Sequence, residues 1–181
     1  MKTINTNWYI VAGAPCSGKT EAIKNLSSLG YDITPEIPRI IIDAEMRNGK
    51  TVEEIRRDEA EFQKRILQMK IKIENELSPK QITFIDDGGI PACIAYFEIA
   101  GLNPKMVIKE ARKRKYKGIF FLERLPYKKD YARIEDIKTA DKLEKLLLKT
   151  YQNLGYKVIL VPVKPTGERI KFILNKLNLS G

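Results

Sequence analysis

Eight residues near the N-terminus have the types and the spacing that bind nucleotide phosphates. The segment Gly13-Ala14-Pro15-Cys16-Ser17-Gly18-Lys19-Thr20 fits the pattern G-x-x-x-x-G-K-[ST] at every fixed position. The glycines allow successive backbone N–H groups to point at phosphate oxygens. The lysine brings a positive charge to the β- and γ-phosphates, and the threonine hydroxyl is a ligand for Mg²⁺. The segment therefore predicts a site for ATP or GTP together with Mg²⁺.

Two carboxylates follow predicted strands and are candidates for the chemistry. Asp86 comes directly after the apolar segment 81–85, where phosphate-loop enzymes place a second carboxylate linked to Mg²⁺. Glu36 follows the expected strand 31–34, on the phosphate-loop side of a parallel sheet. We therefore expect Asp86 to serve the metal. We expect Glu36 and the nearby Arg39 to contact a substrate. The alternatives are a hairpin turn at Asp86 and two ordinary helix-start charges at Glu36 and Arg39.

A basic segment with proline and tyrosine residues, about 123–134, follows the apolar run 118–122. It contains Arg124 and Arg133. This composition is typical of a lid that brings arginines to a phosphate group during transfer. An ordinary charged loop would have the same composition, so the sequence leaves both interpretations open.

Strands alternate with helices along the whole chain, and this positions the candidate residues. The expected strands are 8–12, 31–34, 81–85, 118–122 and 156–161, and the expected helices are 19–28, 38–48, 51–77, 91–100, 103–115, 135–154 and 166–177. This alternation predicts a three-layer α/β fold, with a five-stranded parallel sheet covered by helices on both faces. We expect residues 1–181 to form a single phosphate-loop domain. By analogy with related folds, the expected strand order is 2-3-1-4-5.

Composition limits the functions that remain possible. The chain carries a net charge of +10 and has no histidine, which excludes histidine metal ligands and a histidine general base. Lysine and arginine concentrate in the predicted helix around 109–117, where they form either a solvated face or a site for nucleic acid or anionic lipid. The two cysteines imply no disulfide framework. With a polar N-terminus and no apolar run of membrane-spanning length, the chain is expected to be cytoplasmic.

The motifs together resemble a P-loop AAA-type ATPase and kinase family, which includes the nicotinamide riboside kinase domain of NadR and the TRPL translocation defect protein. The resemblance covers nearly the whole chain and rests on the phosphate loop, segment 36–39, Asp86, segment 123–133 and segment 151–156 followed by Val161-Pro162. One position departs from it. Many family members have arginine after the strand-end aspartate, whereas this chain has Asp87, which removes an expected substrate- or phosphate-binding cation.

The resemblance implies roles for the candidate residues in a kinase. Lys19 and the loop would hold the donor phosphates, and Thr20 would bind Mg²⁺ with Asp86. Glu36 would accept the proton of a small hydroxyl-bearing acceptor such as a nucleoside, and Arg39 would orient that acceptor. Arg124 and Arg133 would neutralise the transferred group.

Two other functions remain open at this stage. One is a nucleotide-dependent switch that docks on anionic lipid or RNA through 109–117. The other is a polynucleotide 5′-kinase.

Overall fold

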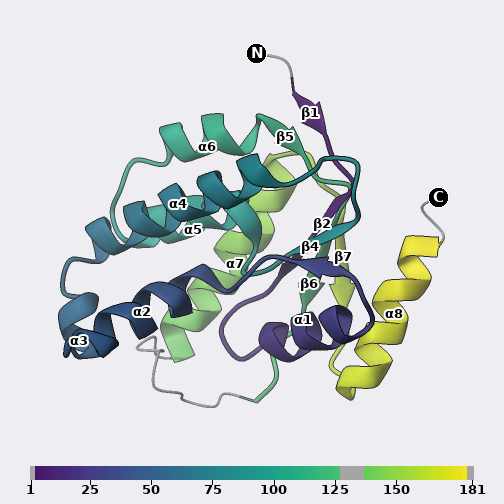
Figure 1. Cartoon of the computed structure of the whole chain (residues 1–181), viewed down its shortest axis with the longest axis horizontal. Coiled ribbons are helices and arrows are strands. Elements are labelled where there is room, and N and C mark those ends of the chain that lie inside the picture. The colour runs from purple at the N-terminus through teal and green to yellow at the C-terminus, as the bar shows by residue number, and fades with distance from the viewer. Residues whose placement is uncertain (1–2, 127–136, 179–181) are drawn as a thin grey trace.

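A five-stranded parallel sheet forms the centre of the molecule (Figure 1). The computed structural model describes residues 3–126 and 137–178. The strands are β2 (Trp8–Ala12), β3 (Asp32–Ile33), β4 (Thr83–Ile85), β6 (Gly118–Leu122) and β7 (Val158–Val161). Their order in the sheet is β3-β4-β2-β6-β7. Counted along the chain within this sheet, that order is 2-3-1-4-5, so the predicted topology is confirmed.

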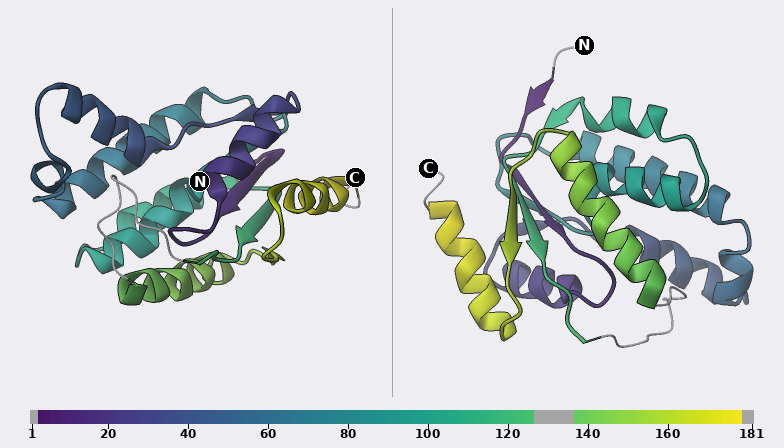
Figure 2. Two further views of the ribbon diagram at one scale, coloured as in Figure 1. Left: turned by 90° about the horizontal axis from the view of Figure 1, so that it is seen from below. Right: turned by 180° about the vertical axis from the view of Figure 1, so that it is seen from behind.

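Helices cover both faces of the sheet, as Figure 2 shows. Helices α1 (Lys19–Ser28) and α8 (Thr166–Asn178) pack on one face, and α5 (Gly89–Ile99) and α7 (Ile137–Asn153) pack on the other. Side chains alternate along β2 to serve the two faces. Tyr9 and Val11 contact the α1 and α8 side, whereas Ile10 and Ala12 contact the α5 and α7 side.

Three helices, α2 (Ile37–Arg47), α3 (Val52–Ile55) and α4 (Glu59–Glu76), form a layer outside α5. The prediction of one continuous helix over 51–77 is wrong, because the chain turns between Ile55 and Glu59. Thr51 forms the expected capping box with Glu54 at the start of α3. Asp58 then caps α4 by accepting a 2.9 Å hydrogen bond from the backbone N–H of Glu61. Two separate N-caps therefore produce two helices.

The basic segment 109–117 is not the single helix that the sequence predicted. Helix α6 (Lys105–Ala111) ends early, and β5 (Arg114–Lys115) pairs in parallel with β1 (Ile4–Asn5). The side chain of Arg114 is buried and lies 3.6 Å from Glu74 and 3.5 Å from Glu110. One of the predicted surface cations is thus an internal structural group, and no basic helical face spans this segment.

The sheet brings the predicted site residues to one edge. The phosphate loop follows β2, Glu36 lies just beyond β3, and Asp86 follows β4. Because the strands are parallel and adjacent, their carboxyl ends meet on the same side of the sheet. None of the helices in residues 3–126 and 137–178 has the length and apolar composition needed to cross a bilayer.

Candidate active site

The phosphate loop curls between β2 and α1. Gly13 and Gly18 adopt positive φ angles of 152° and 82°. A side chain at Gly13 would place its Cβ only 2.8 Å from the backbone oxygen of Leu122, so the tight turn requires glycine there. Gly18 is the N-cap of α1 and provides no side-chain acceptor for the first N–H groups of the helix. These N–H groups suit an anionic ligand at the positive end of the helix.

The polar side chains of the loop also suit a phosphate group. The ammonium of Lys19 donates hydrogen bonds to the backbone oxygens of Gly13, at 2.8 Å, and Ala14, at 3.2 Å. The buried Oγ of Ser17 has no hydrogen-bond partner among the described residues. Unpartnered buried polar atoms are uncommon in folded proteins. A loop with a lysine, free helix N–H groups and an unpartnered hydroxyl therefore fits nucleotide phosphates.

Glu36 connects the phosphate loop to the neighbouring helix α2. As the N-cap of α2 it makes no capping hydrogen bond with its side chain. Its carboxylate instead accepts a hydrogen bond of 3.1 Å from the hydroxyl of Thr20. The Nε of Arg39 lies 3.5 Å from the same carboxylate oxygen. The structure thus brings Thr20 of the phosphate loop together with Glu36 and Arg39, the pair that the sequence singled out for substrate contact.

Asp86 is almost completely buried at the end of β4, with 4% of its surface exposed. Its side chain accepts a 2.6 Å hydrogen bond from the backbone N–H of Asp87. Loss of hydration, followed by repulsion from Asp87, raises the pKa of Asp86 to about 7, although that hydrogen bond and Lys19 oppose the shift. A nearby cation would favour its charged form, so Asp86 and the Thr20 hydroxyl fit the oxygen ligands of Mg²⁺.

Asp87 and Lys70 form a buried ion pair at the position where the family resemblance predicts an arginine. Asp87 has a left-handed backbone with φ of 50°, which is uncommon for a residue with a side chain. The Lys70 ammonium comes from α4 and lies 3.1 Å from the Asp87 carboxylate. Burial alone would lower the pKa of Lys70, but attraction to Asp87 raises it above its ordinary value. Lys70 of α4 therefore places a cation near the position of the expected arginine, and this cation is paired with Asp87.

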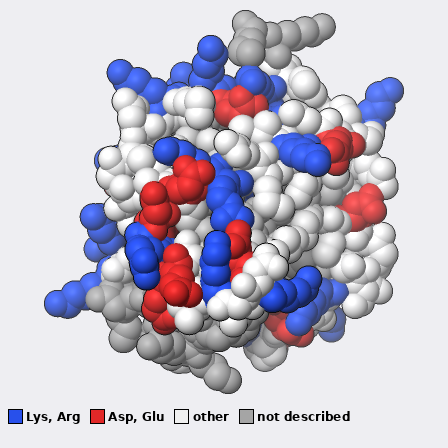
Figure 3. Space-filling view, turned by 60° about the vertical axis from the view of Figure 1, so that its left-hand side comes forward, with Lys and Arg blue, Asp and Glu red and all other residues white. Residues whose placement is uncertain are grey.

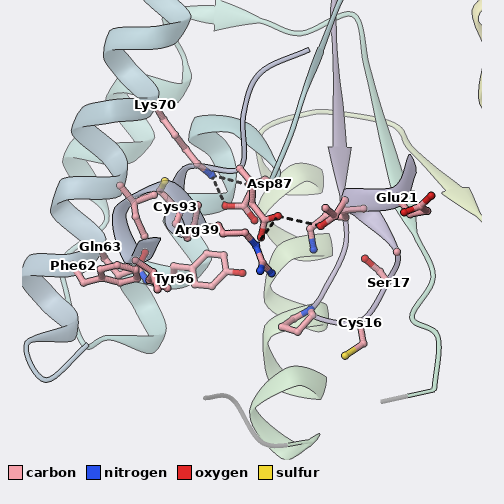
Figure 4. Close-up of a pocket in the computed structure, with 18 of the residues that line it drawn as sticks. Cys16, Ser17, Glu21, Arg39, Phe62, Gln63, Lys70, Asp87, Cys93 and Tyr96 are labelled. Atoms are coloured by element: carbon pink, nitrogen blue, oxygen red, sulfur yellow. Dashed lines mark hydrogen bonds and ion pairs between the residues drawn. The ribbon is translucent and has the colours of Figure 1, made fainter. Parts of the chain in front are cut away.

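A cavity of about 370 Å³ joins these residues. Pro15 to Glu21 of the phosphate loop and α1 line one part of it. We call the other part the acceptor half; its lining includes Glu36, Arg39, Arg56, Phe62, Gln63, Lys70, Asp87 and Tyr96. In Figure 4, Phe62, Gln63 and Tyr96 gather on one side, away from Cys16 and Ser17 of the loop. The cavity therefore extends from the phosphate loop to a second region lined by aromatic and charged side chains.

Arg124, one of the two predicted lid arginines, does not line this cavity. Arg124 forms an ion pair with Asp141 and lies 3.9 Å from Glu144, so it contacts α7. Arg133 lies outside the described residues. Leu125 and Pro126, from the start of the same segment, do line the cavity. The backbone N–H of Leu125 also donates a 2.9 Å hydrogen bond to the oxygen of Cys16.

Sequence reasoning missed Arg169, a buried residue that supports the phosphate loop. From α8, its guanidinium donates to the backbone oxygens of Ser17 at 2.6 Å, Glu123 at 2.8 Å and Pro162 at 2.9 Å. One side chain thus joins the loop to the ends of β6 and β7. No local pattern identifies it, because all three partners are backbone atoms and two lie far away in the sequence.

Comparison with known families agrees with this geometry. A family model described as an AAA domain matches residues 8–169. The chain belongs to this family. The match spans the phosphate loop, both strand-end carboxylates and Arg169. It confirms the resemblance to a P-loop AAA-type ATPase and kinase family that the sequence indicated. No curated protein matches the sequence.

Several solved structures share the fold. Deoxyadenosine kinase from M. mycoides, with dCMP and dCDP bound, superposes with a TM-score of 0.65 at 15% identity, covering 96% of this chain and 100% of that one. NadR in complex with NR gives 0.68 at 15% identity, covering 97% of this chain and 51% of that one. Shikimate kinase from Aquifex aeolicus gives 0.56 at 21% identity, with 96% and 99% covered. At these identities the likeness establishes the P-loop kinase fold.

Proposed function

We propose that the protein is a Mg²⁺-dependent kinase that transfers the γ-phosphoryl group of ATP or GTP to a hydroxyl of a small acceptor such as a nucleoside. The position of Glu36 carries the proposal. Its carboxylate touches Thr20 of the phosphate loop and also lines the acceptor half of the cavity. A carboxylate between a nucleotide-phosphate site and a second binding space is what phosphoryl transfer to a hydroxyl requires.

The donor would bind in the phosphate loop. Lys19 would exchange its bonds to the loop carbonyls for bonds to the β- and γ-phosphates, and the first N–H groups of α1 would contact phosphate oxygens. When bound, Mg²⁺ would neutralise negative charge on these phosphates. Thr20 and Asp86, the latter directly or through water, are the residues that would hold the metal. The segment after β6 has no Asn-Lys-x-Asp guanine motif, which favours ATP over GTP.

The acceptor would lie against Arg39, Phe62 and Tyr96. Its hydroxyl oxygen would attack the γ-phosphorus while Glu36 takes the hydroxyl proton and the donor leaves as a nucleoside diphosphate. Kinases of nucleosides, of nucleoside monophosphates and of shikimate all occur among the solved structures with this fold. Positioned arginines stabilise such transfers, and Arg124 and Arg133 remain our predicted candidates for that task.

A transfer assay tests the proposal. γ-Labelled ATP or GTP with Mg²⁺ would be incubated with the protein and, in turn, with nucleosides, ribosides and 5′-hydroxyl oligonucleotides at low and high salt. We expect label on a small hydroxyl compound, and we expect Glu36→Gln to slow that transfer. Label only on oligonucleotides would favour a polynucleotide 5′-kinase. Tight nucleotide binding without transfer to any acceptor would favour a binding switch.

A further inference from the structure

We propose that the acceptor half of the cavity selects acceptors without an anionic group, because each described basic side chain that lines it is neutralised by a carboxylate of the chain. The inference rests on the proposed kinase function and narrows its substrate class. It favours uncharged nucleosides over nucleotides and carboxylate-bearing alcohols. Three pairs carry the argument: Lys70 with Asp87, Arg56 with Glu59, and Arg39 with Glu36.

Lys70 is the most deeply placed of these cations, with 4% of its surface exposed. Its ammonium has three hydrogen-bond acceptors. They are the Asp87 carboxylate at 3.1 Å, the Asp87 backbone oxygen at 2.7 Å and the Gly89 backbone oxygen at 3.2 Å. An ammonium has three N–H donors, so all of them are used within the protein. An anionic acceptor would have to displace one of these bonds to use Lys70.

Arg56 is paired in a similar way just beyond the end of α3. Its Nε and Nη2 donate to the two oxygens of Glu59, at 3.0 and 2.9 Å. The two parallel bonds give this pair the fixed geometry typical of arginine and carboxylate. The guanidinium also lies over the ring of Phe62, 5.3 Å from its centroid. Arg56 thus stacks on Phe62, and its charge is balanced by Glu59.

Arg39 is paired with the proposed general base, because its Nε lies 3.5 Å from the Glu36 carboxylate. The carboxylates of Glu36 and Asp87 line the cavity themselves. A phosphate or carboxylate group on the acceptor would therefore lose its hydration and face these two negative groups. Acidic and basic side chains also lie next to one another on the outer surface of the molecule in the view of Figure 3.

The remaining lining suits an uncharged planar group. Phe62 and Tyr96 provide aromatic rings, and Gln63 provides an amide from the neighbouring position on α4. Aromatic rings with a few polar groups are typical of small-molecule sites. Because Lys19 is directed to the donor, the described lining leaves no surplus cation to attract an anionic acceptor.

Matched pairs of ligands test the proposal directly. The protein would first be saturated with Mg²⁺ and AMP-PNP, so that a phosphate group cannot bind in the phosphate loop. Each common nucleoside and its 5′-monophosphate would then be titrated by calorimetry. We expect at least one nucleoside to bind at least tenfold more tightly than its own monophosphate. A monophosphate that binds as tightly as its nucleoside overturns the proposal, and so does absence of binding by every nucleoside.

A charge variant links this preference to the ion pairs. Asp87→Asn would leave Lys70 unmatched, and we expect the preference for nucleoside over monophosphate to fall at least fivefold. The control is Glu61→Gln, which makes the same charge change on the exposed side of α4. An equal fall in both variants overturns the proposal. If Asp87→Asn does not fold, Glu59→Gln replaces it, because this variant removes the carboxylate that pairs with Arg56. The same fivefold fall in the preference for nucleoside over monophosphate is then expected.

The outcomes also separate this inference from the kinase proposal. Transfer to a sugar hydroxyl of monophosphates, but not to nucleosides, would leave the kinase proposal standing and overturn the inference. Selective binding of nucleosides without any phosphoryl transfer would support the inference and contradict the kinase proposal.

Discussion

Replacing Asp86 with asparagine is expected to stabilise the metal-free protein above neutral pH. The carboxyl group of Asp86 is 4% exposed, and burial raises its pKa from the ordinary value of 3.8 to about 7. Asparagine keeps the shape of the side chain, and its amide oxygen can still accept the hydrogen bond from the Asp87 N–H. The variant therefore removes a buried charge with little change in packing.

The sign and size of the effect follow from the pKa difference. As pH rises through 3.8, the unfolded chain releases this proton while the folded protein retains it until about pH 7. The free energy of unfolding of the wild type thus falls across this window. About three pKa units correspond to roughly 4 kcal/mol, and the buried amide N–H₂ of asparagine offsets part of the gain. We expect the variant to be more stable than the wild type by about 1–4 kcal/mol at pH 8, and we expect this difference to be about 3 kcal/mol smaller at pH 4.5.

Urea denaturation between pH 4.5 and 8.5, in EDTA and without nucleotide, measures this difference. Asp32→Asn is the control, because the side chain of Asp32 is exposed at the edge of the sheet. The difference between Asp86→Asn and wild type should grow with pH, whereas the control should show no such trend. A difference that does not depend on pH, or a variant that is less stable than wild type at pH 8, would refute the reasoning.

Three further substitutions test separate parts of the account. Glu36→Gln should lower single-turnover phosphoryl transfer by roughly 10² to 10⁴ with donor affinity nearly unchanged, and full activity would mean that Glu36 is only a helix-start charge. Arg169→Ala should weaken calorimetric Mg-ATP binding about tenfold or more, because each of its three lost bonds contributes on the order of 1 kcal/mol to the position of the loop. Arg169→Lys should recover part of this lost affinity, and Lys171→Ala, on the same helix, should cause no loss. Arg114→Ser should cost about 3–5 kcal/mol in denaturation, since it leaves Glu74 buried without its arginine. The exposed Lys115→Ser should cost little, and equal effects would mean that Arg114 is not an internal group.

The elements that local sequence determines could be predicted well. The phosphate loop needs only its glycines, its lysine and the adjoining strand and helix, and all of these lie within about twenty residues. The convergence of Glu36 and Asp86 at one edge followed from the parallel sheet. Their joint contact with the loop region, including the bond from Thr20 to Glu36, required the structure.

Other features depend on contacts that the sequence does not reveal locally. Arg114 looked like a surface cation, but its burial depends on β1, about 110 residues earlier, and on Glu74 of α4. The division between α3 and α4 had a signal in Asp58, which was hidden because the apolar spacing continues from Ile55 to Phe62.

Lys70 could have been found from its position in α4. It lies four residues after Ile66 and seven after Gln63, and both are buried on the same face of the helix. A charged residue on a buried helical face needs a partner, and the unusual Asp87 was available. A lysine on a buried helical face and an aspartate in place of the expected arginine are each unusual. Taken together, they predict the ion pair between Lys70 and Asp87.

Binding of Mg-ATP to the wild type and to Lys19→Ala is the most direct test of the central claim. The claim is that the loop from Gly13 to Thr20 holds the phosphates of a nucleotide in a pocket continuous with the acceptor half. Isothermal titration should give a saturable, Mg²⁺-dependent single site for the wild type. The variant should keep the same thermal unfolding midpoint without nucleotide and lose at least a hundredfold in affinity. Equal affinity in the two proteins would contradict the account.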